Sequence, residues 1–479
     1  MLQEFRNRRT TWALRASVTT VVCAALLTEV AIAATPKLES IAVTPTAPSI
    51  SVGQTQSFTA TGTFNNGTKQ ALGPAMADVA AGYYDTCALL SSGAVECWGA
   101  NDAGEHGDGT TTNSRVPRLP VVGINNATQV TVGQGSACAR LATGAIKCWG
   151  DNGLGELGNG GAPGISTTPV TVSGISTATA VAGGGLFTCA LLANGTVWCW
   201  GYNGNGELGN GTTTESNIPV QVAGINTAVA IATGYAHACA VLASGAVKCW
   251  GWNAFGGLGN GTTTDSNTPV TVLGLSGGRE VAAGNFSTCA LLTDGTERCW
   301  GDNFYGELGD GSAGGSGSYS TTPTHVKGIS TGVAIIAGAY SNCVLLRGGT
   351  IQCWGDNRLG VLGTGGGPGS NVPVSFIGVK SPTRLAGGFY HVCSLFSGGL
   401  LTCWGGNQNG QLGNGHKNTN PNPSPTNVVG TPGVVWQSSD STKATITDHG
   451  LATGRAVGNT TITATTAGFI SDNAVLTVK

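Results

Sequence analysis

The chain carries little charge, because Asp, Glu, Lys and Arg together make up 10% of its 479 residues. Nucleic-acid binding depends on clustered Lys and Arg that neutralise phosphates, and the sequence has no basic run. Beyond the first 33 residues, no hydrophobic segment is long enough to cross a bilayer. We therefore expect no nucleic-acid partner and no stable membrane span in the remaining chain.

Catalytic motifs are also missing. The sequence has no Gly-x-Ser-x-Gly nucleophile elbow, no phosphate-binding glycine loop and no His-Glu-x-x-His zinc motif. Histidine is scarce, with six in the whole chain. We therefore expect a protein that is not an enzyme and that holds no metal ion or other cofactor.

Cysteine, by contrast, is plentiful and regularly placed. Fourteen of the fifteen cysteines form seven pairs with the same internal spacing, and Trp-Gly follows each second cysteine. The tryptophans of these elements recur every 50 to 54 residues. A sevenfold repeat of this length with strand-like segments predicts an all-β fold, a seven-bladed β-propeller over residues 76–430. The pairs are Cys87 and Cys97, Cys138 and Cys148, Cys189 and Cys199, Cys239 and Cys249, Cys289 and Cys299, Cys343 and Cys353, and Cys393 and Cys403.

One repeat, residues 228–275, predicts four short strands over 229–233, 238–242, 246–250 and 269–273. They are rich in Val, Ile, Ala and Cys and bounded by Gly, Asn, Ser and Pro, as in an antiparallel meander. The second and third strands are joined by a three-residue hairpin loop. Its last position is glycine in all seven repeats, as a left-handed residue there requires.

The register of this hairpin places the two cysteines of each pair opposite each other, at a separation that suits a disulfide. We therefore predict seven disulfides, one within each blade. Reduced, buried cysteines are the alternative. Zinc binding is disfavoured, because a hairpin pair does not gather four ligands.

The first 33 residues are typical of a secretory signal peptide. Arg6, Arg8, Arg9 and Arg15 precede an apolar stretch over 16–27, and residues 31–33 offer a small-x-small cleavage site. An uncleaved membrane anchor is the alternative. Cleavage would remove Glu4, Glu29 and the four arginines, leaving 22 of 24 acidic and 18 of 22 basic residues. Because disulfides persist in oxidising compartments, we expect a secreted, periplasmic or cell-surface protein.

The segments 34–75 and 431–479 do not repeat the blade pattern, and each is too short for a core of its own. We expect four strands in the second segment. Joined together, and with motifs at 41–45, 58–62, 436–440 and 458–464, they resemble one bacterial immunoglobulin-like domain of group 2. The resemblance implies that the propeller is inserted into a loop of an immunoglobulin-like β-sandwich, in an extracellular or cell-surface setting. A closed ring returns its chain ends to one place, which permits such an insertion.

Each blade also carries Cys-Trp-Gly-x-Asn and a later Leu-Gly, the latter replaced by His106-Gly107 in the first repeat. This pattern resembles the regulator of chromosome condensation repeat family. The founder of that family is a guanine-nucleotide exchange factor on chromatin, and exported bacterial relatives include a β-lactamase inhibitory protein that binds its target with loop aromatics. The signal peptide, the hairpin cysteines and the sandwich depart from the founder, so no exchange residues are transferred.

A candidate ligand-binding face follows from the meander. The loop between strands one and two opens on the same face as the loop between strands three and four, and both carry large side chains. Tyr and Trp are favoured anchors at interfaces, so we expect a face that binds an extracellular or envelope protein. Carbohydrate binding by the same aromatics, and guanine-nucleotide exchange by family analogy, are the alternatives. The predicted face comprises Tyr83, Tyr84, Asp85, Phe187, Tyr202, Tyr235, His237, Trp252, Phe286, Phe304, Tyr305, Tyr340, Phe389, Tyr390 and His391.

Two sets of polar residues on these loops could suggest metal or acid–base chemistry. Asp85, His237 and His391 share one place, two residues before the first cysteine, but the two histidines stand in blades that are not adjacent. We interpret them as polar loop residues. The glutamates of Gly-Glu-Leu-Gly are likewise predicted to stabilise their turns rather than to bind calcium; they are Glu156, Glu207 and Glu307.

Overall fold

The computed structural model describes residues 38–479 except 118, 377–380, 397–398, 432, 449 and 467–469. In this part of the chain all regular structure is β, with strands β1 to β37. None of its segments is a helix long and apolar enough for a membrane span. The signal peptide predicted over residues 1–33 lies outside the described residues.

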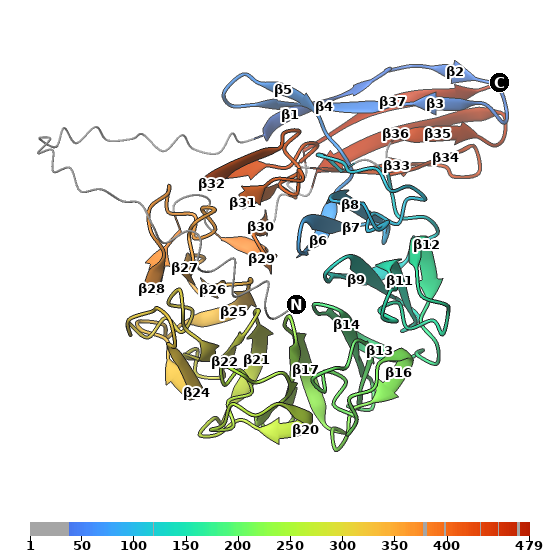
Figure 1. Ribbon diagram of the computed structural model, residues 1–479. Helices are drawn as coiled ribbons and strands as arrows, with labels where there is room; N and C mark the ends of the chain where they lie inside the picture. The colour runs from blue at the N-terminus through green and yellow to red at the C-terminus, as the bar shows by residue number, and fades with distance from the viewer. Residues whose placement is uncertain are drawn as a thin grey trace, which may run out of the picture. The chain divides into compact units, whose positions relative to one another are not determined.

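Seven antiparallel sheets stand around a common centre, which confirms the predicted propeller (Figure 1). Each sheet is one blade, and its strands follow one another in chain order. Blade 1 holds β6 (Met76–Ala81), β7 (Asp85–Leu90) and β8 (Val95–Gly99); blade 2 holds β9 (Ala127–Val132), β10 (Ser136–Leu141), β11 (Ile146–Asp151) and β12 (Ile165–Thr171); blade 3 holds β13 (Ala178–Gly183), β14 (Phe187–Leu192), β15 (Val197–Gly201) and β16 (Ser216–Gln221); blade 4 holds β17 (Ala228–Thr233), β18 (His237–Leu242), β19 (Val247–Gly251) and β20 (Ser266–Thr271).

The remaining blades have the same construction. Blade 5 holds β21 (Gly278–Ala283), β22 (Ser287–Leu292), β23 (Glu297–Asp302) and β24 (Tyr319–His325); blade 6 holds β25 (Gly332–Ala337), β26 (Ser341–Leu346), β27 (Ile351–Gly355) and β28 (Ser370–Ser375); blade 7 holds β29 (Pro382–Gly387), β30 (His391–Phe396), β31 (Leu401–Asn407) and β32 (Asn418–Asn427). The four strands predicted for residues 228–275 are those of blade 4, with ends that differ by at most three residues.

Blade 1 differs from the prediction of four strands in every repeat. Its sheet has three strands, and two isolated bridges, Gly99 to Ser114 and Glu96 to Pro120, stand where a fourth strand would pair. Pro120, which is bridged to Glu96, stands where the other blades have Thr, Gln, His, Ser or Asn, and it has no backbone N–H to donate to a ladder.

The hairpin between the second and third strands has the predicted register. In every blade the first cysteine lies directly opposite the second. All seven pairs are bonded, with Cα–Cα distances of 4.0 to 4.1 Å, which confirms the seven predicted disulfides. The bonds join Cys87 to Cys97, Cys138 to Cys148, Cys189 to Cys199, Cys239 to Cys249, Cys289 to Cys299, Cys343 to Cys353, and Cys393 to Cys403.

The cysteines belong to the interior of the blades and not to a surface site. None of the fourteen side chains is more than 2% exposed, and they share buried clusters with the apolar residues of their own and the adjacent blades. The glycine that ends the hairpin loop has a φ of +74° to +89° in every blade, as the register requires. The disulfides therefore have a structural role, separate from the candidate ligand-binding face.

Each blade packs on the preceding one through the tryptophan of its Trp-Gly element. All seven of these side chains are fully buried. Each indole N–H donates a hydrogen bond of 2.7 to 3.0 Å to a carbonyl oxygen in the third loop of the preceding blade, the loop between strands three and four. Burial of one such side chain stabilises the fold by roughly 2–3 kcal/mol. The donors and acceptors are Trp98 and Gln411, Trp149 and Glu105, Trp200 and Glu156, Trp250 and Glu207, Trp300 and Gly257, Trp354 and Glu307, and Trp404 and Val361.

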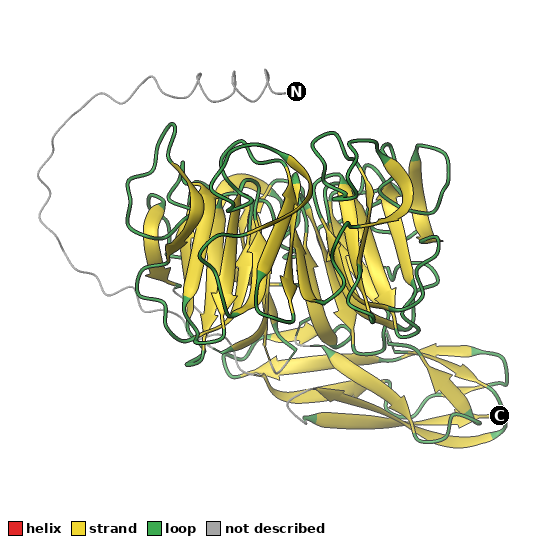
Figure 2. Cartoon of the chain, turned by 90° about the horizontal axis from the view of Figure 1, so that it is seen from below, coloured by secondary structure: helices red, strands yellow, loops and turns green. Residues whose placement is uncertain are grey.

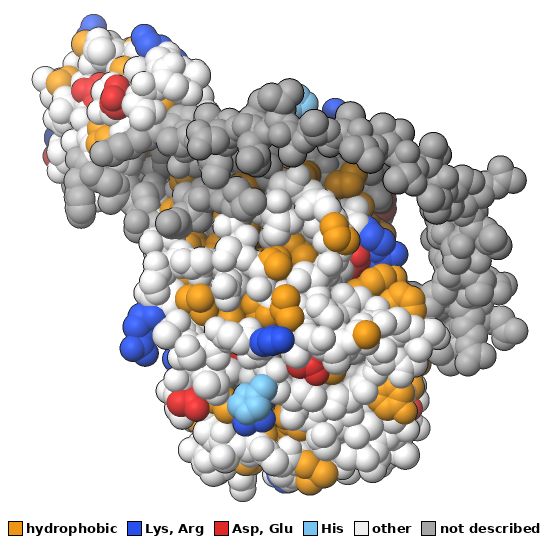
Figure 3. Space-filling view, turned by 90° about the vertical axis from the view of Figure 1, so that its left-hand side faces the viewer, with side chains coloured by type: hydrophobic (Ala, Val, Ile, Leu, Met, Phe, Trp, Pro, Cys, Tyr) orange, Lys and Arg blue, Asp and Glu red, His pale blue; other side chains and the backbone are white. Residues whose placement is uncertain are grey.

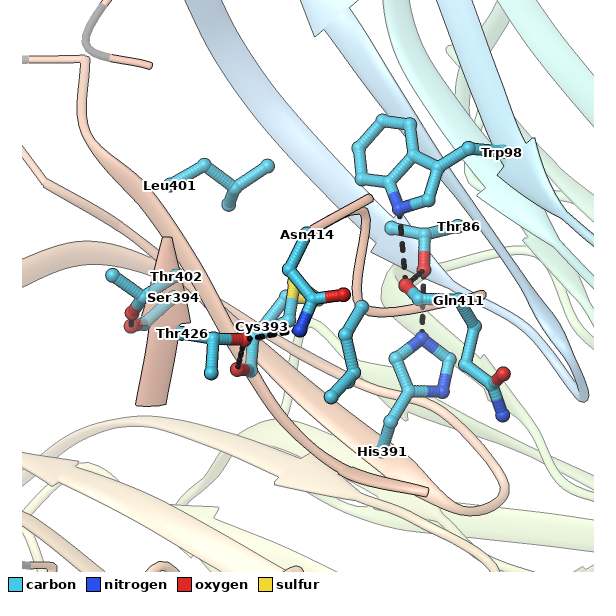
Figure 4. Close-up of a disulfide and its surroundings, with 12 residues drawn as sticks. Thr86, Trp98, His391, Cys393, Ser394, Leu401, Thr402, Gln411, Asn414 and Thr426 are labelled. Carbon is cyan, nitrogen blue, oxygen red and sulfur yellow. Dashed lines mark hydrogen bonds between the residues drawn. A yellow bond between two sulfur atoms is a disulfide. The ribbon is translucent and has the colours of Figure 1, made fainter. Parts of the chain in front are cut away.

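The contact between blade 7 and blade 1 closes the ring (Figure 4). The Trp98 indole and the Thr86 hydroxyl both donate to the Gln411 carbonyl oxygen, at 3.0 and 2.9 Å. Leu395 and Leu401 of blade 7 share one buried cluster with Trp98. The last interface thus repeats the contact that joins the other blades, and the described strands of blades 1 and 7 each come from one continuous stretch of chain.

The third loops are held by buried polar side chains. Asn203 accepts a hydrogen bond from the Leu208 amide at 2.9 Å and donates to the Thr212 and Thr214 carbonyl oxygens. The Glu207 carboxylate accepts from the Asn205 amide at 2.9 Å. Glu156 and Glu307 accept from the Leu154 and Tyr305 amides in the same way. The turn-stabilising role predicted for the three glutamates is confirmed.

The segments that flank the propeller fold together into a β-sandwich. Three sheets, β1-β4-β5, β2-β37-β36-β33 and β3-β35-β34, share one core that includes Val43, Phe58, Ile462 and Leu476. The second segment forms five strands rather than the predicted four. The strands are β1 (Leu38–Thr44), β2 (Ser49–Ile50), β3 (Thr55–Ser57), β4 (Thr59–Phe64), β5 (Lys69–Ala71), β33 (Val434–Ser438), β34 (Ala444–Ile446), β35 (Leu451–Gly454), β36 (Gly458–Thr466) and β37 (Ser471–Val478).

The chain enters and leaves the propeller at the same place. The Gly73 amide donates to the Gly430 carbonyl oxygen at 2.7 Å, and the Val434 amide donates to the Gly73 carbonyl oxygen at 2.8 Å. The Ala75 amide donates to Val434 at 3.1 Å. The two crossing segments thus run side by side, and the propeller is an insertion into the sandwich, as predicted.

The disulfide pairing predicts the number of free thiols in the purified protein, and the same count tests whether the predicted signal peptide is removed. In denaturant without reductant, the purified protein should show no free thiol, because fourteen cysteines are paired and the fifteenth, Cys23, lies in the predicted signal peptide, whose cleavage would remove it. After reduction, fourteen thiols should appear. One thiol before reduction would show that the leader is retained, and several would contradict the pairing.

Candidate ligand-binding face

The loops of the blades open on two opposite faces of the ring. The first loops, between strands one and two, and the third loops lie on one face, which we call the loop face; the hairpin loops lie on the other (Figure 2). The Ser91 amide in the hairpin loop of blade 1 donates to the Ala75 carbonyl oxygen at 2.8 Å. The sandwich therefore joins the propeller on the hairpin side and leaves the loop face free.

A ring of glycines brings the first loops together around the centre of the loop face. One glycine per blade stands five residues before the first cysteine. A Cβ on six of the seven would lie 2.8 Å or less from the backbone oxygen of a glycine in a neighbouring blade, and a Cβ on the seventh would overlap Val132. Only glycine permits this approach. The ring consists of Gly82, Gly133, Gly184, Gly234, Gly284, Gly338 and Gly388.

Backbone hydrogen bonds join these loops from blade to blade. The Gly185 amide donates to the Gly234 carbonyl oxygen at 3.1 Å, and the Tyr235 amide donates to Gly284 at 3.2 Å. The Phe389 amide donates to Gly82 at 2.9 Å across the closing interface. A cavity of about 100 Å³ at the mouth of the central channel is lined by first-loop residues of all seven blades. The loop face thus has a narrow, backbone-lined centre.

Aromatic side chains from blades 1, 7 and 6 pack together beside this channel mouth. The ring centroid of Tyr83 lies 3.8 Å from that of Phe389, and Tyr84 stacks on Tyr390 at 5.4 Å. Tyr340 of blade 6 lies 5.9 Å from Phe389. We call these five residues the tyrosine cluster. All five are half-buried, so each ring is partly open to solvent.

The tyrosine cluster continues into blade 5 and meets a fixed cation there. Tyr305 lies 5.2 Å from Tyr340 and 4.6 Å from Phe304. The guanidinium carbon of Arg358 stands 4.4 Å from the centre of the Tyr305 ring. The same guanidinium is bonded to the Asp356 carboxylate at 2.9 and 3.0 Å.

A second group, the tryptophan cluster, joins blades 4 and 5. Trp252 lies 4.6 Å from Phe286 and 5.5 Å from Phe255. Tyr235 and Tyr319 contact its edges, at 6.1 Å from Phe286 and 6.4 Å from Phe255. These aromatics come from first loops, third loops and the start of β24, so they lie on the loop face as well.

Tyrosine hydroxyls give the face polar groups without charge. Burial, followed by the neighbouring hydroxyls of Tyr390 and Tyr84, raises the pKa of Tyr83. Burial and then Tyr84 also raise the pKa of Tyr390, and burial raises the pKa of Tyr235. All three hydroxyls therefore stay neutral at physiological pH and can both donate and accept hydrogen bonds.

Four residues predicted for the face are not on its surface. Asp85, Phe187, His237 and His391 are the first residues of second strands, not loop residues, and their exposed fractions are 2%, 2%, 1% and 0%. Their side chains lie between blades, because the next blade in the ring covers the position two residues before the first cysteine. Their assignment to the ligand-binding face is wrong.

The two histidines join neighbouring blades instead. His391 Nε2 lies 2.7 Å from the Thr86 hydroxyl, and His237 Nε2 lies 2.8 Å from the Thr288 hydroxyl (Figure 4). Each threonine hydroxyl already donates its proton to a backbone carbonyl oxygen, so it accepts from Nε2–H of the histidine. Burial lowers the pKa of His391 to about 3 and that of His237 to about 4.

The tyrosine and tryptophan clusters, with Phe304 and Tyr305, form an aromatic arc that covers only part of the ring. Blades 2 and 3 have Gln134 and Leu186 in their first loops, where the other blades have aromatics. Tyr202 stands in the third loop of blade 3, and no other ring in the described part of the chain packs against it. Burial and then Glu207 raise the pKa of Tyr202. The loop face thus has an aromatic side over blades 4 to 7 and 1, and a side over blades 2 and 3 where Tyr202 stands apart from the arc.

Several residues that shape the face were not predicted from the sequence. The glycine ring has a clear signal, one glycine at a fixed distance before each cysteine pair. Tyr319 lies in a fourth strand and joins the face only because the third loop of blade 5 is longer than that of blade 4. Arg358 has no counterpart in the other repeats, so periodicity could not mark it.

Stretches of both the propeller and the sandwich match models of known protein families. Models of the regulator of chromosome condensation (RCC1) repeat match residues 194–241 and 244–291, and a second model of this repeat matches 76–105, 178–207, 228–256, 279–307 and 333–361. The model of the bacterial Ig-like domain (group 2) matches residues 424–478.

Curated relatives match a part of the propeller. The chain is 31% identical over 140 residues to the human E3 ubiquitin-protein ligase HERC2, which is 28% of this chain and 3% of that protein. It is 32% identical over 141 residues to the Arabidopsis thaliana RCC1 domain-containing protein RUG3, mitochondrial, which is 28% of this chain and 32% of that protein. The matched part thus spans less than a third of either relative.

Solved structures of the same fold cover most of the chain. Prp20p from Saccharomyces cerevisiae superposes with a TM-score of 0.62 at 20% identity, over 76% of this chain and 90% of Prp20p. Human WBSCR16 superposes with a TM-score of 0.60 at 21% identity, over 71% of this chain and 96% of that protein. At these identities the likeness supports the fold alone.

The glycine ring can be tested by adding one methyl group. Gly234→Ala should lower the free energy of unfolding by about 2–4 kcal/mol, because its Cβ would overlap the Gly284 carbonyl oxygen in the next blade. Gly348→Ala is the matched control, since a Cβ there meets nothing within 4 Å and the residue is not left-handed; its effect should stay within about 0.5 kcal/mol. Urea unfolding followed by tryptophan fluorescence measures both. Equal midpoints for the two variants would contradict the close packing of the loops.

The buried histidines should make the fold sensitive to acid. Between pH 6.5, the ordinary value, and about 4, the unfolded chain binds a proton at His237 and His391 that the folded chain does not. Stability from this source is complete above pH 6.5 and decreases as the pH falls, by up to about 1.4 kcal/mol per pH unit for each histidine. Serine stands at this place in blades 2, 5 and 6, so the double variant His237→Ser/His391→Ser should fold. Urea unfolding between pH 7 and pH 5 should show a smaller loss for the variant than for the unaltered protein, and equal losses would argue against neutral buried histidines.

Proposed function

We propose that this chain, in which regulator of chromosome condensation repeats are inserted into a bacterial Ig-like domain, is an exported or cell-surface binding protein without catalytic activity. It holds a protein ligand on the loop face of the propeller. Seven disulfides and a bacterial Ig-like domain point to a protein that works outside the cytoplasm. Yeast Prp20p, a propeller of the same fold, binds Gsp1p and histones, so this scaffold can hold proteins.

One observation carries the proposal: aromatic rings from blades 4, 5, 6, 7 and 1 gather on the face away from the sandwich. Half-buried Tyr and Trp side chains give a large contact area with little loss of side-chain entropy, which is why they act as anchors at interfaces. The backbone beneath them is fixed by the glycine ring, and varied side chains stand on one constant frame. A rigid frame with varied aromatics suits selective binding of one partner.

The packing of the rings favours a protein ligand over a carbohydrate. A sugar stacks on one open, flat ring. Here the rings pack on one another, most of them edge to face, as between Tyr83 and Tyr390 at 81° and between Tyr340 and Phe389 at 76°. In an edge-to-face pair the edge of one ring covers a face of the other, which removes that face as a flat platform for a sugar. Aromatic rings with neutral hydroxyls match the mixed polar and apolar surface of a protein.

Site-directed cross-linking tests the face while the ligand is still unidentified. A photoreactive phenylalanine analogue at position 84 or 252 should cross-link one discrete envelope or extracellular protein in the cells that produce the chain. The same analogue at position 198 is the control, because Trp198 lies in β15 next to the hairpin loop of blade 3 and is half-buried. A cross-link from position 198 alone would place the ligand elsewhere.

Alanine variants then measure the contribution of the rings to the affinity for the cross-linked protein. Tyr84→Ala, Tyr390→Ala and Trp252→Ala should each weaken binding by about 5- to 150-fold, since aromatic anchors contribute about 1–3 kcal/mol. Trp198→Ala should leave the affinity unchanged. A glycan array run with the same protein separates the carbohydrate alternative: binding to a glycan, with no protein cross-linked, would replace the proposed function.

A further inference from the structure

We infer that the partner of the loop face presents a cationic surface, rich in Arg and Lys, to the aromatic arc. The inference rests on the proposed function and specifies the chemistry of the ligand. It is carried by the distribution of charge between the two faces of the propeller and by a guanidinium that the loop face already binds.

The third loops concentrate acidic residues. The stretches between third and fourth strands, including the bridged stretch 100–113 of blade 1, hold ten Asp and Glu but only two basic residues, Arg358 and Lys417. The other eleven Lys and Arg of residues 76–430 lie outside these stretches. The ten are Asp102, Glu105, Asp108, Glu156, Glu207, Glu215, Asp265, Glu307, Asp310 and Asp356.

Five of these carboxylates remain available to a ligand. Glu105, Glu156, Glu207 and Glu307 are buried in their turns, and burial raises their pKa values. Asp102, Glu215 and Asp265 are exposed, and Asp108, Asp310 and Asp356 are half-buried. Asp356 is already paired with Arg358.

Charge elsewhere on the molecule is sparse, as Figure 3 shows for one side, where charged side chains are few among uncharged ones. The third loops therefore hold most of the acidic residues of the propeller, and those of blades 4, 5, 6 and 1 lie in blades that also carry the aromatic arc. Acidic residues beside aromatic anchors attract a positive partner and select against a negative one.

The contacts of Arg358 show how the loop face can bind a cation. Its guanidinium is held between the Tyr305 ring, at 4.4 Å, and the Asp356 carboxylate, at 2.9 Å, while the side chain itself remains exposed. A ring and a carboxylate from neighbouring blades thus bind one guanidinium by cation–π attraction and by ion pairing together. The tryptophan cluster offers a second site of this kind, with Trp252 and Asp265 at the two ends of one third loop.

At equivalent positions other repeats carry asparagine, which identifies substitutions that remove a charge and keep the loop geometry. Asp108 accepts hydrogen bonds from the Thr110 amide and hydroxyl, and Asn210 accepts the same pair from Thr212 in blade 3. Asp310 makes these contacts with Ser312. Asp265 accepts from the Asn253 amide at 2.7 Å, as Asn113 does from Asn101 in blade 1. The variant Asp108→Asn/Asp265→Asn/Asp310→Asn should therefore fold like the unaltered chain.

The matched control removes the same number of charges away from the loop face. Asp294, in the hairpin loop of blade 5, accepts from Thr296 as Asn194 accepts from Thr196 in blade 3. Asp440 and Glu39 lie in the sandwich. The control variant is Glu39→Gln/Asp294→Asn/Asp440→Asn, and thermal unfolding checks that both variants keep the stability of the unaltered protein.

The probes are synthetic peptides of equal length, one set rich in Arg and Lys, one rich in Glu and one uncharged, titrated into the full mature chain at low and at high salt. We expect binding of the basic peptides that weakens with salt. The loop-face triple variant should weaken it about tenfold, the loss for three exposed charges of about 0.5 kcal/mol each. Trp252→Ala should weaken it as well, and the control triple variant should leave it unchanged.

The other outcomes overturn the inference and separate it from the proposed function. Binding of uncharged or acidic peptides that depends on Trp252 but not on the three aspartates would reject a cationic partner and leave the aromatic face in place. An equal loss of affinity for the basic peptides in both triple variants would show that the peptides respond only to the net charge of the protein. Absence of binding by the basic peptides would also reject the inference. The cross-links from positions 84 and 252 would then be the test of the proposed function.

Discussion

The structure depends on one contact that occurs seven times: a buried tryptophan of each blade hydrogen-bonded to a third-loop carbonyl oxygen of the preceding blade. This contact fixes the angle between blades and at the same time anchors the base of the loop that carries variable side chains. Because the acceptor is a backbone group, the side chain at that place is free to differ, and it is Glu, Gly, Val or Gln in different blades. Each third loop thus contains a backbone contact that is the same in all blades and side chains that differ from blade to blade.

The glycine ring has the complementary role at the centre. Where the tryptophans hold the blades apart at a fixed spacing, the glycines let the first loops approach to backbone contact, so the channel mouth is narrow and lined mostly by main chain. Large side chains that follow these glycines, such as Tyr83, Tyr235 and Phe389, cannot turn into the channel and gather over its rim. The aromatic arc on the loop face is a consequence of the lack of space beneath it.

Regular repetition made much of this architecture predictable. The hairpin glycines fixed the register, the register placed the cysteines opposite each other, and the spacing of Trp-Gly gave the blade count. The failures occur where one repeat differs from the rest. In blade 1, Pro120 replaces a residue that can donate to the ladder, and two isolated bridges stand where the other blades have a fourth strand. In blade 5, the longer third loop brings Tyr319 to the face. His237 and His391 were placed on the surface because a polar residue near a predicted loop suggests exposure, whereas the neighbouring blade supplies a threonine that makes burial possible. Contacts between repeats cannot be derived from the pattern of one repeat.

The disulfides and the ring closure serve different purposes. Every disulfide joins two strands of the same blade that are already paired by backbone hydrogen bonds, so none crosses from one blade to another. They stabilise blades but cannot prevent the ring from opening between blades 7 and 1, where only non-covalent contacts act. The sandwich supplies what the disulfides do not: it holds Gly73 and Gly430 side by side and so keeps the two ends of the propeller together. Folding of the split sandwich and closure of the ring therefore favour each other, because each brings together the chain ends that the other needs.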